Sequence, residues 1–279
     1  MASSAAEIKM SIERIEGADD SRVAVFREVP DAERLRSQGL FVAEGRFIVA
    51  RILGEPRYRV RAVLVNDASR RELAAAFDRR SDVPIFVADR HDILDLTGHD
   101  LHRGCLALVE RPPAACPQDV LSSTGTVVVL EGVSNADNVG GVFRNVAAFD
   151  AAGVLLSPTC CDPLYRKAIR TSMGATLRVP FARLDDWPAA LVQVRAAGFT
   201  IAALTPREPS ESLLAFSQRP RRRTALLVGT EGAGLSAAVE AAADHRVRIP
   251  ISDTVDSLNV AVAAGIALHA LRKGDSCPL

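Results

Sequence analysis

Apolar and polar positions follow a large-scale α/β pattern in the second half of the chain. Short, nearly continuous apolar runs occupy residues 127–130, 154–156, 201–204, 225–228 and 247–251. Runs of this kind are typical of strands buried on both faces of a parallel sheet. Helical spacing of apolar residues fills the intervals 139–150, 165–173, 187–197, 236–243 and 257–271. The alternation predicts an α/β fold with a doubly wound parallel sheet.

The first half shows the same alternation on a smaller scale. Helices are expected over 31–38, 46–54, 69–80 and 91–97, and strands over 40–43, 60–66, 84–88 and 105–110. Residues 1–20 are polar and of mixed charge, so we expect a loosely ordered start. Three prolines between 112 and 117 break the pattern. We therefore predict a small α/β domain over 1–111, a proline-rich linker over 112–122 and a larger domain over 123–279.

Charge and cysteine content narrow the classes of protein that fit. The chain has 34 basic and 34 acidic residues, so any basic patch for nucleic acid must be local. Its five cysteines form no CxxC pair and no zinc spacing, which predicts free thiols and no metal site. No apolar run approaches the roughly 20 residues of a membrane span. Without a signal-peptide pattern, we expect a soluble cytoplasmic protein.

A C-terminal stretch combines a strand, a polar loop and a helix of small residues. The strand over 245–251 runs into a loop, and a helix is expected to begin at Ser257 with Ser257 as its N-cap. No charge occurs from Ser257 to Ala270, so we expect this helix to be buried against the sheet. An ordinary core helix that follows a strand would show the same composition.

Another candidate site lies where the strand over 127–130 turns into a helix. Ligands collect at such carboxyl ends in open α/β sheets. Asn138 is a residue type that caps helices, Gly140 and Gly141 allow another backbone to come close, and Arg144 projects from the second turn. A capped helix with one exposed arginine would look the same in isolation.

A glycine-rich loop follows the strand over 225–228. Gly229, Gly232 and Gly234 resemble a dinucleotide loop, but the GxGxxG order is absent and no phosphate-binding lysine follows. A loop of this kind suits an uncharged, adenosine-like ligand that backbone groups contact. An ordinary strand–helix turn needs one glycine at most, and it does not account for Glu231.

The three stretches, taken in order, resemble the three motifs of the SpoU (TrmH-like) branch of the SPOUT RNA methyltransferases. The motifs are Asn-x-Gly-x-x-x-Arg from Asn138, Gly-x-Glu-Gly-x-Gly-Leu from Gly229, and Ile-Pro-Ile with Ser-Leu-Asn-Val-Ala from Ile249. The resemblance covers about 126–271. It implies a deep trefoil-knotted α/β domain, a homodimer through that domain, and S-adenosylmethionine as cofactor.

The resemblance also implies roles for individual residues. Arg144 matches the arginine associated with catalysis at the ribose, and the other catalytic candidates are Asn138, Glu231, Ser257 and Asn259. The cofactor-binding candidates are Gly229, Gly232, Ile249, Ile251, Leu258 and Leu204. Asn145 stands where many members of the family have Ser or Thr.

Two further segments are candidate RNA contacts. The stretch 166–175 looks like the family segment between the first and second motifs, with Arg166, Lys167 and Arg170 as cations. The first domain resembles, less specifically, a ribosomal-protein-like RNA-binding domain, with Arg46 in the stretch that carries the likeness. Arginines on a solvated surface would give the same pattern, and acidic residues are interleaved among them.

The hypothesis that follows is methyl transfer from S-adenosylmethionine to a ribose 2′-hydroxyl, with large-subunit (23S) rRNA as the favoured substrate. The guanidinium of Arg144 is a poor base, since its pKa exceeds about 12. We expect Arg144 to stabilise the forming alkoxide instead. The alternatives are the same chemistry on tRNA, a non-catalytic RNA-binding assembly factor, and a nucleotide-dependent oxidoreductase. The missing GxGxxG disfavours the oxidoreductase.

Overall fold

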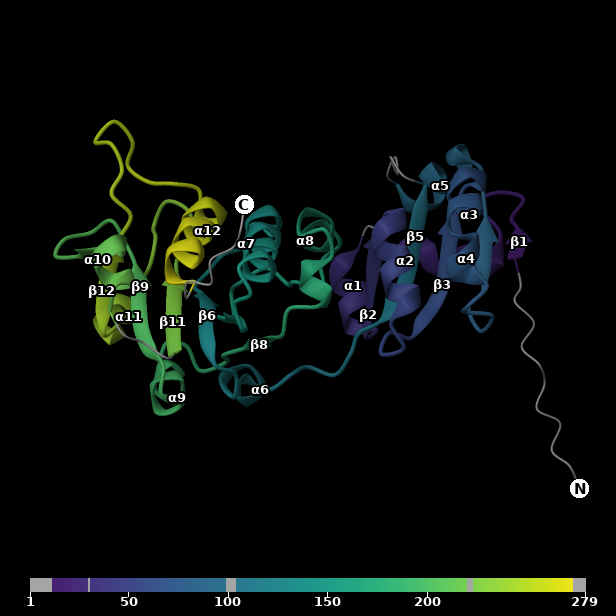
Figure 1. Cartoon of the computed structure of the whole chain (residues 1–279). Coiled ribbons are helices and arrows are strands. Elements are labelled where there is room, and N and C mark those ends of the chain that lie inside the picture. Colours follow the sequence, from purple (N-terminus) through teal and green to yellow (C-terminus); the bar gives the residue numbers. More distant parts are fainter. Residues whose placement is uncertain (1–11, 30, 99–103, 220–222, 273–279) are drawn as a thin grey trace, which may run out of the picture. The chain divides into compact units, whose positions relative to one another are not determined.

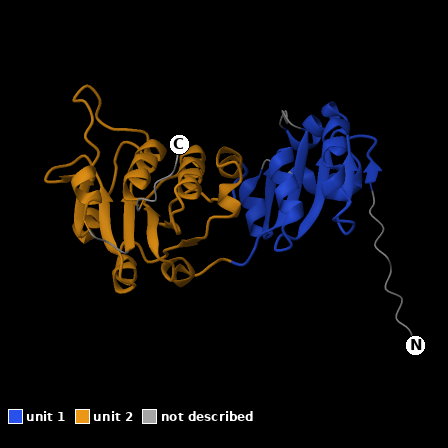
Figure 2. Ribbon diagram, in the orientation of Figure 1, with its two compact units in different colours: residues 1–113, 164–166 blue, residues 114–163, 167–279 orange. Residues whose placement is uncertain are grey.

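The computed structural model describes residues 12–29, 31–98, 104–219 and 223–272. The chain divides into two compact units, shown in Figure 2. The first unit comprises residues 1–113 with 164–166, and the second comprises residues 114–163 with 167–279. No helix within the described ranges is long and apolar enough to cross a membrane.

The first unit is built on a mixed five-stranded sheet in the order β1-β4-β3-β5-β2 (Figure 1). Strand β5 is antiparallel to β2 and β3, while β4 is parallel to β3 and β1. The strands are β1 (Ile12–Arg14), β2 (Leu40–Glu44), β3 (Val60–Val65), β4 (Ile85–Val87) and β5 (Cys105–Glu110). The helices are η1 (Ser21–Glu28), α1 (Ala32–Ser37), α2 (Arg46–Gly54), α3 (Asp67–Glu72), α4 (Ala74–Phe77) and α5 (Arg90–Thr97).

Two expectations for the first unit were wrong. Residues 12–28 are not a loose start, because β1 pairs with β4 and η1 buries Val23 and Phe26 completely. Residues 1–11 lie outside the described ranges. The single helix expected over 69–80 is interrupted at Leu73, where the backbone leaves helical geometry between α3 and α4.

The second unit confirms the predicted doubly wound parallel sheet. Its seven strands pair in parallel in the order β10-β12-β9-β11-β6-β7-β8. They are β6 (Gly125–Leu130), β7 (Gly153–Leu156), β8 (Phe181–Arg183), β9 (Thr200–Leu204), β10 (Glu211–Ser212), β11 (Arg223–Val228) and β12 (His245–Arg248). The edge strands β8 and β10 were missed because they are only three and two residues long. The trefoil knot stays a prediction.

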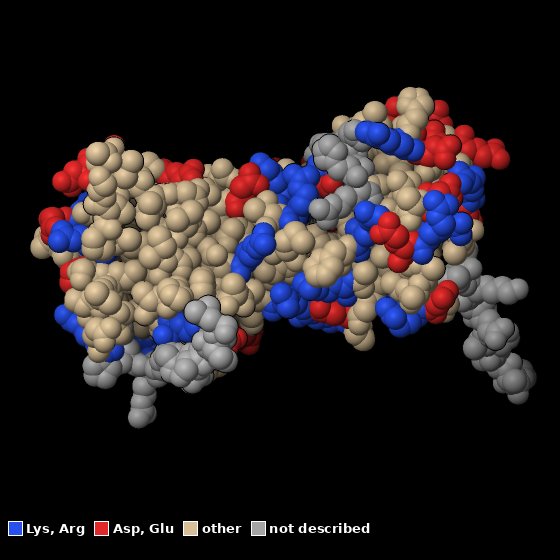
Figure 3. Space-filling model, turned by 45° about the horizontal axis from the view of Figure 1, so that its top comes forward, with Lys and Arg blue, Asp and Glu red and all other residues tan. Residues whose placement is uncertain are grey.

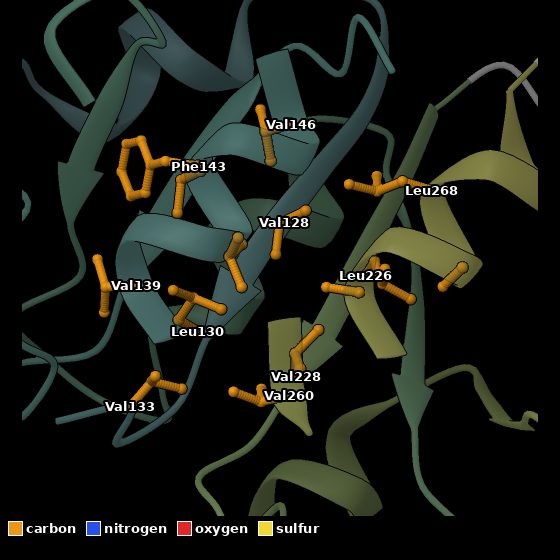
Figure 4. Packing of buried hydrophobic residues seen from close by; sticks show 14 of the residues in the cluster. Val128, Leu130, Val133, Val139, Phe143, Val146, Leu226, Val228, Val260 and Leu268 are labelled. Atoms are coloured by element: carbon orange, nitrogen blue, oxygen red, sulfur yellow. The ribbon is translucent and has the colours of Figure 1, made fainter. Parts of the chain in front are cut away.

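Helices cover both faces of this sheet, because alternate residues of each strand point to opposite sides. Val128 and Leu130 of β6 belong to one apolar core with α7 and α12, shown in Figure 4. Val127 and Val129 belong to another, with α6, α9 and α11. The helices are α6 (Pro117–Leu121), α7 (Ala136–Ala148), α8 (Arg166–Thr171), η2 (Ala175–Leu177), α9 (Leu191–Ala196), α10 (Leu213–Ser217), α11 (Ala237–Ala242) and α12 (Val260–Leu271). Helix α6 thus begins within the stretch expected to be a linker.

Helices α7 and α12 approach each other through small residues. A Cβ added to Gly141 would lie 2.7 Å from the Cβ of Ala261, and one added to Gly265 would lie 3.0 Å from Nδ2 of Asn145. The same Nδ2 donates a hydrogen bond of 2.6 Å to the carbonyl of Ala261. Asn145 therefore joins the two helices, which its place in the motif did not reveal.

The expectation that the last helix is buried holds for one face only. Ala264, Ala267 and Leu268 are buried in the core, whereas Val262 is 51% exposed and Ile266 is 41% exposed. An uncharged helix can carry a second apolar face that covers nothing within its own chain. The lack of charge therefore did not predict burial on all sides.

Candidate cofactor cavity and active site

A cavity of about 420 Å³ lies at the carboxyl ends of β9, β11 and β12. Three loops line it, within residues 204–207, 228–235 and 249–260. The lining includes all six predicted cofactor-binding residues: Leu204, Gly229, Gly232, Ile249, Ile251 and Leu258. It also includes Glu231, Ser257 and Asn259 from the catalytic set. The structure brings these nine residues to one place, and their roles stay predictions.

The glycine-rich loop, residues 229–235, folds back on itself beside the cavity. Thr230 pairs with Gly234, and a Cβ on Gly229 would overlap the backbone of Gly234 and Leu235. Gly232 and Gly234 have φ values of +79° and +70°, which side-chain-bearing residues rarely adopt. The glycines allow the backbone itself to form one wall of the cavity.

The side chain of Asn259 connects all three motifs. Its Nδ2 donates to Oδ1 of Asn138 at 2.9 Å and to Oε1 of Glu231 at 3.0 Å. Its Oδ1 accepts from the backbone N–H groups of Ala261 and Val262, at 3.0 and 3.3 Å, and so caps α12. One amide therefore ties the first turn of α7, the loop after β11 and the start of α12 into one assembly.

Two predicted helix caps were wrong. Helix α12 begins at Val260 and is capped by Asn259, because the amide of Asn259 reaches the first-turn N–H groups, whereas Ser257 lines the cavity two residues earlier. Helix α7 begins at Ala136 and is capped by Asn135, whose side chain accepts from the N–H of Asp137 at 2.8 Å. Asn138 is thus inside the helix, buried, and its amide oxygen is available to Asn259.

Arg144 lies outside the cavity lining, on the exposed surface of α7. Within the described residues its guanidinium makes no hydrogen bond and no ion pair. Neither Asn138 nor Glu231 bonds to Arg144; Asn259 engages both of them. The cation of Arg144 is left available to a ligand.

The predicted RNA-contacting cations are mostly paired with carboxylates. Nζ of Lys167 lies 2.8 Å from Oδ2 of Asp137, and this contact, with the hydroxyl of Thr171, lowers the pKa of Asp137. Arg166, which belongs to the first unit, lies 3.4 Å from Glu44, and Arg46 pairs with Glu72. Arg170 is exposed on α8. These four residues do not meet at the cavity.

Sequence reasoning missed Glu131, which fixes the start of α11. Its carboxylate accepts from Nε1 of Trp187 at 2.9 Å and from the N–H and hydroxyl of Ser236, each at 2.8 Å. Its position directly after β6 was the available signal. Its partners lie 56 and 105 residues further along the chain, so no local pattern connects them.

No group of three or more His, Cys, Asp or Glu residues in the described part of the chain is placed to hold a metal ion. The polar groups at the cavity are amides, hydroxyls, two carboxylates and one guanidinium. This set suits a small organic ligand with hydrogen-bonding edges better than a bound cation.

Comparison with known proteins decides the family. The model of the SpoU rRNA methylase family matches residues 125–269. An uncharacterized tRNA/rRNA methyltransferase of Mycobacterium bovis is 39% identical over 261 residues, covering 90% of this chain and 88% of the relative. The chain belongs to the SpoU rRNA methylase family. The resemblance drawn from the three motifs is confirmed, and the protein is a SpoU-family RNA methyltransferase.

Solved structures share the fold of this SpoU-family chain. An AdoMet-bound rRNA methyltransferase from Sinorhizobium meliloti superposes with a TM-score of 0.78 at 24% identity, covering 94% of this chain and 97% of its own. The SpoU methyltransferase AviRb from Streptomyces viridochromogenes gives a TM-score of 0.75 at 23% identity, with coverages of 90% and 96%. At these identities the likeness shows the fold alone.

Proposed function

We propose that this SpoU-family enzyme transfers a methyl group from S-adenosylmethionine to a ribose 2′-hydroxyl of RNA, with large-subunit rRNA as the favoured substrate. The observation that carries the proposal is the convergence of the second and third motifs on one cavity, with the side chain of Asn259 tying Asn138 of the first motif to them.

The cavity suits S-adenosylmethionine in size and in chemistry. Its volume of about 420 Å³ falls in the range of small-molecule sites. Leu204, Ile249 and Leu258 offer apolar contacts for an adenine ring, while the glycine-rich loop presents backbone donors and acceptors. The carboxylates of Glu231 and Asp256 on the lining would supply counter-charge to a sulfonium or ammonium. The Sinorhizobium protein of the same fold was crystallised with AdoMet.

The chain's own contribution to chemistry is positioning and charge stabilisation. When bound, the cofactor supplies a methyl group on a positively charged sulfur. In the transfer the methyl carbon would exchange its bond to sulfur for a bond to the 2′-oxygen, and the hydroxyl proton would pass to solvent. Arg144 would donate hydrogen bonds to this oxygen as negative charge develops there, which is the usual electrostatic route to a lower barrier. Asn138 and Glu231, both held by Asn259, keep the loops around the cavity in one arrangement. Ser257 shapes the loop that precedes α12.

The choice of rRNA over tRNA rests on the first unit. A small α/β unit precedes the methyltransferase unit and offers a second surface for a large RNA partner. The same chemistry on tRNA is the second candidate, because the Mycobacterium bovis relative carries both substrates in its name.

The deciding experiment is methyl transfer from radiolabelled S-adenosylmethionine to unmodified total RNA, separated into large rRNA, small rRNA and tRNA. Label in large rRNA that nuclease mapping places on a ribose supports the proposal. Label in tRNA replaces the substrate with the second candidate, and label on a base overturns the ribose assignment. Cofactor binding without transfer to naked RNA or ribosomal particles would make the protein a binding module.

The homodimer is also part of this proposal. Val262 and Ile266 form an exposed apolar face on α12, and uncharged atoms dominate the part of the second unit visible in Figure 3. Two copies of such a face bury each other's apolar area. We expect a dimer in sedimentation equilibrium and a shift toward monomer in Val262→Asp. A monomeric wild-type chain would remove the dimer from the proposal.

A further inference from the structure

Arg207 stands on the wall of the cavity, three residues after β9 ends at Leu204. Among the described residues that line the cavity it is the only arginine or lysine. Its Nη2 donates to the carbonyl of Ala233 at 2.8 Å, and its Nη1 donates to the carbonyl of Leu235 at 2.9 Å. One guanidinium therefore holds two carbonyls of the glycine-rich loop, one on each side of Gly234.

The loop needs such support because of its composition. Gly229, Gly232 and Gly234 give the unbound backbone many conformations, and ordering glycine costs more conformational entropy than ordering any other residue. The pairing of Thr230 with Gly234 closes the loop on itself but does not attach it to the rest of the sheet. The planar fork of an arginine suits two carbonyls at once, and less of its freedom is lost per hydrogen bond.

Glu240 holds the guanidinium of Arg207 in place. Nη1 of Arg207 lies 3.1 Å from Oε1 of Glu240, which also accepts from the hydroxyl of Thr205 at 2.8 Å. Glu240 is 5% exposed, and a buried carboxylate requires a cationic or hydrogen-bonded partner. The backbone N–H of Arg207 donates to the same hydroxyl of Thr205. The guanidinium is thus held in place before any ligand arrives.

We propose that Arg207 and Glu240 form a brace that keeps the glycine-rich loop in its cofactor-binding conformation, with Arg207 as a positioning residue. The inference rests on the proposed use of S-adenosylmethionine and deepens it, since neither residue belongs to the three motifs. The brace acts on cofactor binding and not on the methyl-transfer step. Removing it raises the KM for S-adenosylmethionine and leaves kcat at saturation close to that of the wild type.

The test compares full-length variants by calorimetric titration with S-adenosylmethionine. Arg207→Gln loses the charge and the fork, so its Kd rises about tenfold to a hundredfold, the equivalent of one or two charge-assisted hydrogen bonds. Arg207→Lys keeps the charge beside Glu240 but reaches only one carbonyl, so it restores part of the affinity. Glu240→Gln weakens the brace indirectly and gives a smaller rise.

Arg195 supplies the matched control. It makes the same kind of brace, with Nη2 donating to the carbonyl of Ala242 at 2.6 Å and to Asp244 at 2.9 Å. It lies outside the cavity lining, and its side chain is about as exposed as that of Arg207. Arg195→Gln therefore lowers the unfolding temperature without changing the Kd for the cofactor.

A second readout needs no cofactor. Amide hydrogen exchange in residues 229–235 of the free protein becomes faster in Arg207→Gln and stays unchanged in Arg195→Gln. Unchanged exchange and unchanged Kd in a folded Arg207→Gln protein overturn the brace, and so does an equal loss of affinity in Arg195→Gln. If the wild type does not bind S-adenosylmethionine, the cofactor assignment fails, and the exchange measurement still decides whether the brace exists.

Discussion

Arg144 in the second unit differs from several exposed arginines of the first unit. In the first, Arg14 pairs with Asp67, Arg61 with Glu110 and Arg57 with Glu55, so positive and negative atoms interleave over its surface (Figure 3). In the second, Arg144 is exposed on α7 and has no partner within the described residues. Exposed pairs contribute only about 0–1 kcal/mol each to stability. An exposed cation without a partner is therefore more informative about function than a larger number of paired ones.

The largest expected effect is on Arg144. Arg144→Ala lowers kcat for methyl transfer by about a hundredfold to a thousandfold, as removal of one donor from a charge-stabilising site does. Its Kd for S-adenosylmethionine stays unchanged, because Arg144 does not line the cavity. Single-turnover methylation and calorimetry measure the two quantities. Arg61→Gln, which removes a paired arginine from the first unit, is the comparison, and the contrast fails if both variants lose the same activity.

The second largest effect is expected from substitution of Asn259. Asn259→Ala removes the cap of α12, worth about 1 kcal/mol, and leaves the buried amide oxygen of Asn138 without its donor, at about 1–3 kcal/mol. Both the free energy of unfolding, from urea titration, and cofactor affinity fall.

Asn259→Asp separates these two roles. It keeps the capping oxygen but replaces the donor with a carboxylate beside Glu231, so it retains more stability than Asn259→Ala while losing cofactor affinity. Equal affinity in Asn259→Asp and the wild type would show that the link between the motifs is not needed for binding.

A smaller effect is expected in the glycine-rich loop. Gly229→Ala forces its Cβ into the backbone of Gly234, and backbone cannot move aside as a flexible side chain can, so the loop must shift and the Kd for cofactor rises. Gly232→Ala is the matched control, since it meets no atom within 4 Å and carries only the strain of its positive φ, about 1 kcal/mol. Thermal unfolding with and without cofactor distinguishes the loss of cofactor affinity in Gly229→Ala from the loss of stability in Gly232→Ala. A larger loss of affinity in Gly232→Ala would contradict this account.

The smallest effect concerns a paired cation of the second unit. Lys167 lowers the pKa of Asp137 in the folded state, so the pair stabilises the protein above the ordinary pKa of aspartate and this contribution disappears as the pH falls through the lowered value. Both side chains are nearly half exposed, so the contribution is a few tenths of a kcal/mol. Asp137→Asn should unfold at a lower temperature than the wild type near neutral pH and at the same temperature in strong acid. A difference in unfolding temperature between the two proteins that grows in acid would contradict this prediction.

The sequence predicted the parallel sheet of the second unit well, because each buried strand is a self-contained apolar run. It also identified nine of the residues that line the cavity, since loops such as the one from Gly229 follow strands whose carboxyl ends must share an edge. The residues at which the helices begin were predicted less well. Both Ser257 and Asn259 are good caps, and what selects Asn259 is its contact with Asn138, 121 residues away.

The residues that were missed share one physical cause. Glu131 and Arg207 act through partners that are remote in the chain, and Arg207 works through backbone carbonyls, which leave no signature in a sequence. The exposed face of α12 was missed for another reason. Apolar composition indicates that a surface is to be buried, but it does not show which partner buries it.

The position of Asn259 has a consequence for how the protein is made. During translation the first unit, β6 and α7 leave the ribosome early. The side-chain amide of Asn259, which joins the three motifs, emerges only with the start of α12. Every preceding strand of the sheet has by then left the ribosome. A nascent chain therefore has every strand of the sheet outside the ribosome before the residue that joins its three motifs has emerged.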